Sequence, residues 1–515
     1  MIETNPFLIK EPELIFGSSR EEKDPRLGLK YFGPYYPPNE DTFSPTQARL
    51  GIIGTGYTIR GTKLILDRLR TPIISENSNR WLFPDYPGAS KDHGIRCDFI
   101  LSDSWNQTIT DYEIQKVIKI EDVNYRINQG VNLFLEKVKA IKNEDSPPDV
   151  IICALPIEIE HACGISDITR GATRPKYSDL EMKIERFKRA GQTFLDYYTI
   201  EIEEETNIND EEDEEEQGKS YNFRNSLKGL VMEYGIPTQL LKQSNIEAIL
   251  NYNSRSTVQH PSVYSWNLST ALYYKARGRP WRLAKLPEGS CYIGIAFYQN
   301  KLNPLLDMET SMAQVFTHTG EGFVLRGSDV VKGKYSRDLH LSESQSETLL
   351  DNAIKLYTEK VGVEPNRIVL HKTTSYSEAE IEGFKRVIGK THHDFVSMRK
   401  EYSLKFLRTG KYPILRGTVI PLDPNQYIVY TTGYIPRLRT YPGHRIPIPL
   451  RLHHIGDSEI TTIVSEILGL SKLNWNTTQF STQHPITLEF ARRVGRVLSE
   501  LPEDREIQNH YRFYM

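Results

Sequence analysis

The sequence lacks the long apolar run that a membrane-spanning helix needs. No stretch of about eighteen consecutive apolar residues occurs in the 515-residue chain. The first residues, Met-Ile-Glu-Thr-Asn-Pro, also lack the basic start and apolar core of a secretory signal peptide. We therefore expect a soluble, cytoplasmic protein that has no membrane partner.

Cysteine is scarce. The four cysteines show no paired spacing of the kind that zinc sites use. Cys153 and Cys291 lie in apolar runs that are typical of buried strands. This pattern favours reduced core thiols over disulfides or a cysteine-based metal centre.

The chain also has little net charge, −3 at pH 7, but this value hides an uneven distribution. Residues 201–216 contain eleven acidic residues and no lysine or arginine, which leaves 64 basic and 56 acidic residues elsewhere, a net charge of +8. Such a run is typical of a solvated, disordered insertion, which we place at residues 201–218. The alternative is that it mimics nucleic acid and covers a basic groove.

The first half of the chain has the pattern of an α/β domain. Buried strands at residues 49–56 and 149–156 alternate with helices at 59–69 and 128–141. These elements predict a Rossmann-like domain over residues 1–285, with two short strands in residues 13–36.

The first strand ends in a partial dinucleotide-binding fingerprint. Gly54 and Gly56 occupy the first two glycine positions of G-x-G-x-x-G, but Ile59 stands at the third. A Rossmann-type nucleotide-binding protein is therefore an open alternative, and a half-sheet without a dinucleotide is the preferred interpretation.

The second half, residues 286–515, predicts an RNase H-like domain. Three strands are followed by a helix, a further strand and a further helix, which is the element order of that fold. We place them at residues 290–298, 312–317, 322–327, 342–361, 367–372 and 377–388.

Four polar residues at the ends of predicted elements could surround one phosphate group. Arg224 and Lys228 are four residues apart on one helix face, Gln239 begins a short strand, and Lys275 ends a second helix. Lysines on helix faces are more often simply solvated, so spacing alone does not decide between the two readings.

The order and spacing of these residues resemble the MID domain of prokaryotic Argonautes. That domain holds the 5′ phosphate of a guide strand with an aromatic residue or His, a Lys four residues later, a Gln eleven residues further and a late Lys. Arg224 departs from the usual Tyr or His, although its planar cation can still stack or pair with phosphate. The run Gly278-Arg-Pro-Trp281 likewise resembles the family's exit into its PIWI domain.

The resemblance implies that the PIWI domain cannot cut. Active PIWI domains carry Mg²⁺-binding carboxylates at positions that are Ala296, Thr373 and Arg492 here. We therefore expect no enzymatic activity in this chain. An active RNase H-like nuclease that uses carboxylates elsewhere remains an alternative.

A short, inactive Argonaute is expected to act through partners. The resemblance implies a small guide RNA, a single-stranded target DNA and a separately encoded APAZ-containing effector with a sirtuin-like, TIR or nuclease domain. It also implies an antiviral role, a heterodimer and a higher oligomer on target binding. A structural Mg²⁺ is expected beside the guide phosphate, held in part by the terminal carboxylate of Met515.

The C-terminal third is rich in cations. Residues 385–416 contain nine lysines and arginines against Asp394 and Glu401, and tyrosines follow at 427, 430, 434 and 441. Cations that alternate with aromatic residues predict a groove for a nucleic-acid duplex.

Overall fold

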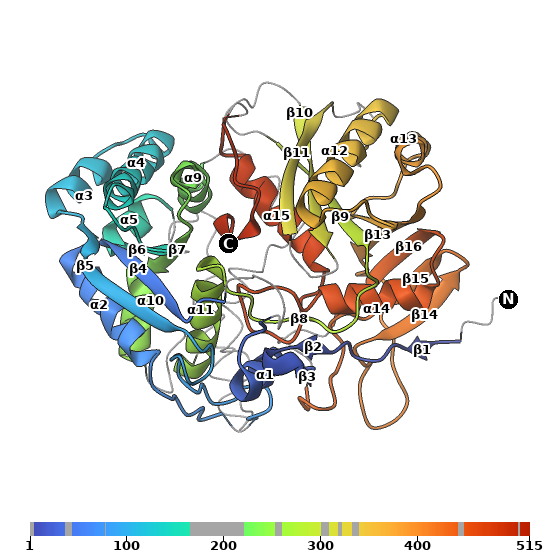
Figure 1. The fold of residues 1–515 in the computed structure, drawn as a ribbon, viewed down its shortest axis with the longest axis horizontal. Helices are drawn as coiled ribbons and strands as arrows, with labels where there is room; N and C mark the ends of the chain where they lie inside the picture. The colour runs from blue at the N-terminus through green and yellow to red at the C-terminus, as the bar shows by residue number, and fades with distance from the viewer. Residues whose placement is uncertain are drawn as a thin grey trace.

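The described chain forms two α/β halves that lie side by side (Figure 1). The computed structural model describes residues 5–36, 44–77, 79–164, 221–252, 260–299, 308–317, 322–331, 339–440, 447–502 and 505–515. The acidic insertion predicted at residues 201–218 and Tyr441 lie outside these ranges.

The first half contains a parallel sheet of four described strands in the order β5-β4-β6-β7. Their bounds are Gln47–Gly54 (β4), Asp98–Thr108 (β5), Val150–Leu155 (β6) and Thr238–Lys242 (β7). Every residue of β6 is buried, which explains why its sequence is uniformly apolar.

Helices cover both faces of this sheet. One face packs against α3 (Asp111–Ile118), α4 (Val123–Lys142), α5 (Ile157–Ala162) and α9 (Phe223–Val231). The other face packs against α2 (Gly56–Arg68), α10 (Gln243–Leu250) and α11 (Pro261–Lys275). This is the Rossmann-like arrangement that the sequence predicts.

The second half is built on a sheet of nine described strands in the order β1-β14-β15-β16-β13-β12-β9-β10-β11. Strand β10 pairs antiparallel with both β9 and β11, and β12 and β13 run parallel to β9. This is the RNase H-like order. The bounds are Phe7–Leu8 (β1), Ser290–Gln299 (β9), Met308–Thr317 (β10), Gly322–Val331 (β11), Arg367–Lys372 (β12), His392–Lys400 (β13), Thr418–Asp423 (β14), Gln426–Val429 (β15) and Leu450–Gly456 (β16).

Alternate residues of β9 face different helices. Ile293 and Ile295 pack with α12 (Glu343–Val361) and α13 (Glu378–Ile388), whereas Tyr292 packs in the core that contains α14 (Ile460–Leu470) and α15 (Ile486–Leu498). A Cβ at Gly294 would lie 2.2 Å from the carbonyl oxygen of Thr487, so the first turn of α15 rests directly on β9. Glycine at this position therefore sets how closely α15 approaches the sheet.

The N-terminal residues reach the second sheet before the chain enters the first. Strand β1 pairs with β14, and Glu11 accepts hydrogen bonds from the buried side chains of Arg416 and Lys472. A three-stranded sheet of described residues follows, made of β2 (Leu14–Ile15), β3 (Glu21–Glu22) and β8 (Arg282–Leu283).

One local prediction was wrong. The sequence pattern places the second strand expected within residues 13–36 at residues 28–36, but Gly28 to Phe32 is helical, in α1 (Pro25–Phe32). The Asp24 carboxylate accepts hydrogen bonds from the backbone of Arg26 and Leu27, and Pro25 occupies the first helical position. These two start signals outweigh the turn character of the glycines.

Within the described ranges, no helix combines the length and the apolar character needed to cross a membrane.

Candidate nucleic-acid interface

Two of the four predicted phosphate-binding residues meet beside strand β7 of the first sheet, and a third lies on a helix that packs against the same strand. Lys228 lies on α9, Gln239 is the second residue of β7, and Lys275 ends α11. The Lys275 ammonium donates a hydrogen bond to the side-chain oxygen of Gln239. Only 3% of Lys228 and 1% of Lys275 is exposed, so both charges lie in a largely dry environment. This burial does not fit the alternative interpretation, in which the two lysines are solvated on helix faces.

The two lysines act on the same part of the sheet. Burial raises the pKa of the Cys153 thiol, on β6, to about 12, and the charges of both Lys228 and Lys275 oppose this rise. Cys153 follows Ile152, the residue of β6 that pairs in register with Gln239. Positive charge in this buried region favours an anion.

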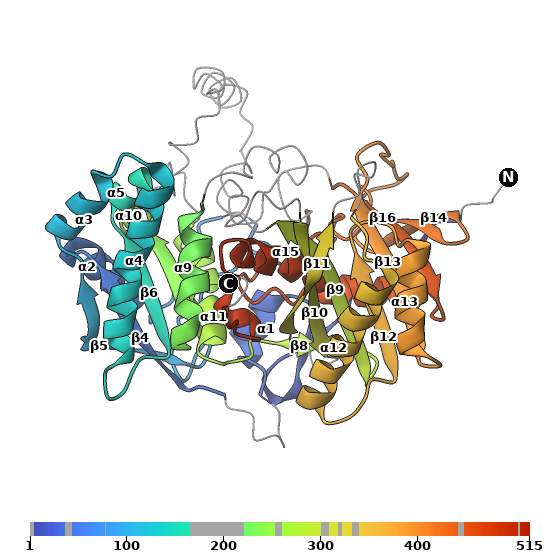
Figure 2. The ribbon, with the colours of Figure 1, turned by 90° about the horizontal axis from the view of Figure 1, so that it is seen from above.

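The chain end lies beside this cluster. The short 3-10 helix η5 (Tyr511–Phe513) packs against α11, and Met515 is only 1% exposed. Figures 1 and 2 both show the C-terminus at the centre of the molecule, between α9, α11 and α15. Arg224, the fourth predicted residue, lies one turn before Lys228 and acts electrostatically on the buried Tyr511.

The glycine pair after β4 has a packing explanation. A Cβ at Gly54 would lie 2.3 Å from the Thr58 hydroxyl and 2.7 Å from the carbonyl oxygen of Ala154. Thr55 and Thr58 form a capping box at the start of α2. Gly54 is thus needed for strand–helix packing without any dinucleotide.

Two of the positions matched to PIWI carboxylates from the sequence lie at the same end of two neighbouring strands of the second sheet. Ile295 of β9 pairs in parallel register with Lys372 of β12, so Ala296 and Thr373 are the next residues beyond the last pair. Ala296 packs in the core that contains α15, the helix that carries Arg492. The three positions therefore share one region of the fold, but none of the three side chains is a carboxylate.

Cations surround this region. The Arg399 side chain donates a hydrogen bond of 3.1 Å to the carbonyl oxygen of Thr373. Burial and the charges of Arg492 and Lys400 hold the pKa of His484 well below its usual range. A site of this kind repels Mg²⁺ and attracts phosphate.

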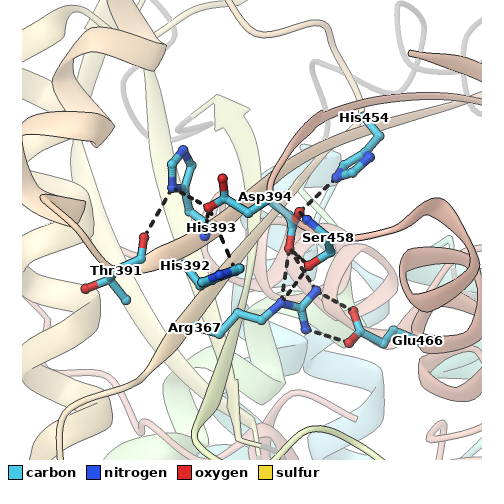
Figure 3. A network of polar contacts seen from close by, with 9 residues as sticks. Arg367, Thr391, His392, His393, Asp394, His454, Ser458 and Glu466 are labelled. Carbon is cyan, nitrogen blue, oxygen red and sulfur yellow. Dashed lines mark hydrogen bonds and ion pairs between the residues drawn. The ribbon is translucent and has the colours of Figure 1, made fainter. Parts of the chain in front are cut away.

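Buried carboxylates of the second half are engaged elsewhere. Asp394 accepts hydrogen bonds from Arg367, His454 and Ser458, and Arg367 also pairs with Glu466 (Figure 3). Arg367 begins β12, so the network lies at the opposite end of the strand from Thr373. Burial raises the pKa of Asp394, but these donors lower it further, to well below the usual range.

The network contains Ser, His and Asp but not the connections of a hydrolase triad. A nucleophilic serine must donate to the histidine, whereas here the Ser458 hydroxyl and His454 both bond to the Asp394 carboxylate. The sequence reading missed this network because its members are far apart in the chain. Its geometry indicates that it fixes β12, β13 and β16 to α14.

Three further histidines, His371, His392 and His393, have structural surroundings. His371 is buried, contacts the Thr487 hydroxyl at 2.8 Å, and has its pKa lowered to about 3 by burial and by Arg367. His392 and His393 lie near Asp457 at the surface. Among the described residues, no group of three or more His, Cys, Asp or Glu side chains could hold a metal ion.

The cation-rich C-terminal third is only partly available for a ligand. Arg386 pairs with Glu343 and Glu347, and Arg416 is buried against Glu11. Tyr430 is buried as well. Several cations and rings that predicted a duplex groove therefore serve the fold instead. Lys405, Arg408 and Lys411 are exposed in the long connection between β13 and β14.

Comparison with solved structures identifies proteins that have the same fold as this chain. The chain matches Clostridium butyricum Argonaute bound to a guide DNA and a 19-mer target DNA with a TM-score of 0.61 and 15% identity, over 99% of this chain and 54% of that one. The fold is that of the Argonaute MID and PIWI domains. A. aeolicus Argonaute matches with a TM-score of 0.53 and 13% identity, over 98% of this chain and 54% of that one. A structure of Aa-Ago with externally bound siRNA matches with a TM-score of 0.54 and 12% identity, over 99% of this chain and 56% of that one.

Neither a protein-family model nor a curated protein matches the sequence. The chain spans about half the length of the Argonautes it resembles. The predicted fold class, a Rossmann-like MID domain followed by an RNase H-like PIWI domain, is confirmed.

Proposed function

We propose that this protein binds a guide strand by its 5′ phosphate and pairs it with a complementary target. The observation that carries the proposal is the burial of Lys228 and Lys275, of which Lys275 is hydrogen-bonded to Gln239 and both act electrostatically on Cys153. A phosphate placed there would receive charge-assisted hydrogen bonds, each worth about 1.5–3 kcal/mol. Arg224, near the chain end, would complete the site.

The bound target would not be cleaved. Two-metal cleavage needs clustered carboxylates, and Ala296, Thr373 and Arg492 supply none. The neighbouring cations Arg399 and Lys400 suit the backbone of a guide–target duplex instead. A purified chain should therefore leave a labelled target intact in Mg²⁺, and guided cleavage would support the nuclease alternative.

An inactive binding chain needs a partner to produce an effect. In keeping with a short Argonaute, we propose that the guide is RNA, the target is single-stranded invader DNA, and the partner is an APAZ-containing effector. Target binding would activate the effector's NAD-degrading or nuclease domain, with assembly into a higher oligomer. Co-expression with the effector should yield a complex whose activity depends on guide and target.

A Mg²⁺ ion beside the guide phosphate would neutralise part of its charge. A hard cation needs oxygen ligands, and the terminal carboxylate of Met515 and the phosphate oxygens fit that requirement. The burial of Met515 and the packing of η5 on α11 support this placement of the carboxylate.

The test compares 5′-phosphorylated and 5′-hydroxyl guides of one sequence. Lys228→Ala should weaken only the phosphorylated guide, by tenfold or more. Lys139→Ala, which removes an exposed lysine from α4, is the matched control and should change neither affinity. Equal weakening of both guides by Lys228→Ala would contradict the assignment. Sequencing the nucleic acid that copurifies with the protein would identify the guide.

A further inference from the structure

A pocket of about 290 Å³ lies where the two halves of the chain meet, outside the proposed phosphate site. Asn79, Arg80 and Trp81 line it from the connection between α2 and β5, and Arg439 lines it from the connection between β15 and β16. Its volume is at the lower end of the range of small-ligand sites, roughly 300–1,000 Å³. The pocket has room for one small planar group and not for a duplex.

Asn79 holds the two connections together. Its side-chain nitrogen donates a 2.9 Å hydrogen bond to the carbonyl oxygen of Leu438, and its side-chain oxygen accepts from the Leu82 backbone. Below the pocket, Leu82 and Leu438 pack with Phe480 in a small apolar cluster. The pocket floor is therefore built by contacts between distant segments.

Trp81 presents an indole ring at this surface. All five tryptophans lie in the described ranges; Trp266 and Trp281 are fully buried, Trp475 is 3% exposed and Trp105 is partly buried, whereas Trp81 is 47% exposed. An exposed indole inside a pocket offers a flat stacking surface.

Two arginines line the pocket together with Trp81. Arg80 and Arg439 are exposed, and neither forms an ion pair with any other described residue. Arg439 also adopts a φ of 56°, a left-handed conformation that is unfavourable for a residue with a long side chain. Such local strain persists only where surrounding contacts enforce it. The tight turn that ends at Thr440 enforces it here, through a backbone hydrogen bond between Ile435 and Thr440.

We propose that this pocket binds one nucleotide unit, with the base stacked on Trp81 and the adjoining phosphate paired with Arg80 and Arg439. A ring and two cations in one pocket match a planar base joined to an anion. An uncharged aromatic ligand would leave the arginines unused, and a cationic ligand would be repelled. The ligand class is therefore a nucleotide, either free or within a single strand.

The proposal does not depend on the 5′-phosphate site. Its residues come from the 79–81 and 439 positions, whereas that site uses α9, β7 and α11. A 5′-hydroxyl single strand should therefore occupy the pocket as well as a phosphorylated one. The Lys228→Ala variant should likewise retain this binding, so failure of either proposal leaves the other intact.

The experiment follows tryptophan fluorescence during titration with a 5′-hydroxyl single-stranded oligonucleotide and, separately, with mononucleotides. Quenching that is lost in Trp81→Phe would assign the signal to Trp81. Quenching by the oligonucleotide alone places a strand in the pocket, and quenching by mononucleotides as well places free nucleotides there. No quenching by either ligand would overturn the proposal.

Substitutions test the cations. The double variant Arg80→Ala, Arg439→Ala should raise the Kd of the quenching ligand about tenfold. A double variant of α4, Lys139→Ala with Lys142→Ala, removes the same charge from another exposed surface and should leave the Kd unchanged. Equal effects of the two double variants would mean that only overall charge matters, and would overturn the assigned pocket.

Discussion

The ammonium group of Lys275 and the side-chain oxygen of Gln239 form a hydrogen bond that joins the end of α11 to the start of β7. The Gln239 side-chain nitrogen donates in turn to the Leu240 carbonyl oxygen at 3.1 Å. The amide is thus held at both of its polar atoms. A lysine fixed in this way loses less side-chain entropy when an anion binds, which is a direct advantage for a phosphate site.

Gln239→Glu should convert this contact into an ion pair and place a negative charge where the phosphate would bind. We expect the affinity for a 5′-phosphorylated guide to fall by ten- to a hundredfold, on the basis of about 1.5–3 kcal/mol for a charge-assisted contact. Competition binding would measure this change in affinity. Gln115→Glu adds the same charge on the exposed surface of α3 and serves as the control. An unchanged preference for the 5′ phosphate in Gln239→Glu would argue against the site.

Arg492→Ala tests the proposed duplex surface near Ala296 and Thr373. If Arg492 contacts a phosphate of the duplex, its removal should weaken all sequences equally and reduce the slope of log K against log salt concentration by about 1. Filter binding of a guide–target duplex over a range of salt concentrations would show this. A loss of affinity without a change in slope would point to a structural role for Arg492 instead.

The sequence predicts where helices and strands lie better than it predicts which of them pack together. The apolar run of β6 and the helix limits of α12 follow from local patterns, and the structure agrees with both. The convergence of Lys228 with Lys275 was suggested by resemblance to a family, because their spacing alone also fits two solvated helices. Only the burial of the lysines, which depends on how α9 and α11 pack, separates the two readings.

Contacts between residues that are far apart in the chain could not be predicted from the sequence. Strand β1 pairs with β14 more than 400 residues away, and no local pattern specifies that pairing. The same holds for Arg367 with Asp394 and Glu466, and for Asn79 with Leu438. Each of these contacts depends on the tertiary fold, because the sequence around each residue gives no sign of its distant partner.

Stability should rise with pH between about pH 5 and pH 7, in part because of His371. Its folded-state pKa is lowered to about 3, against about 6.5 when unfolded, so the unfolded chain binds the extra proton first. This contribution is fully present above pH 6.5 and is lost as the pH falls, by about 2 kcal/mol between pH 7 and pH 5. Urea unfolding of His371→Asn should show a smaller difference between these pH values. His392→Asn, at an exposed site, should behave like the unaltered protein.

Asp394→Asn should destabilise the second half strongly. The substitution removes the charge that Arg367 and His454 face, and turns an amide donor toward some of the groups that now donate to Asp394. Breaking a buried ion pair costs about 3–5 kcal/mol. Asp457→Asn is the same change at a more exposed neighbour and should cost less than about 1 kcal/mol. Similar unfolding free energies for the two variants would show that the network is not a structural anchor.

Adding three residues, Gly-Ser-Gly, after Met515 tests the terminal carboxylate. The extension moves this charge away from the end of α11, beside the proposed phosphate site, so a Mg²⁺ ion there would lose a ligand. We expect guide affinity in Mg²⁺ to fall about tenfold, to near the value measured in EDTA, while affinity in EDTA changes little. Because the Met515 side chain is buried, Met515→Leu is needed as a control. It alters packing but keeps the carboxylate, and it should retain the difference between the two buffers. If the extended protein and the unaltered chain respond to Mg²⁺ alike, the chain end packs against α11 without binding the ion.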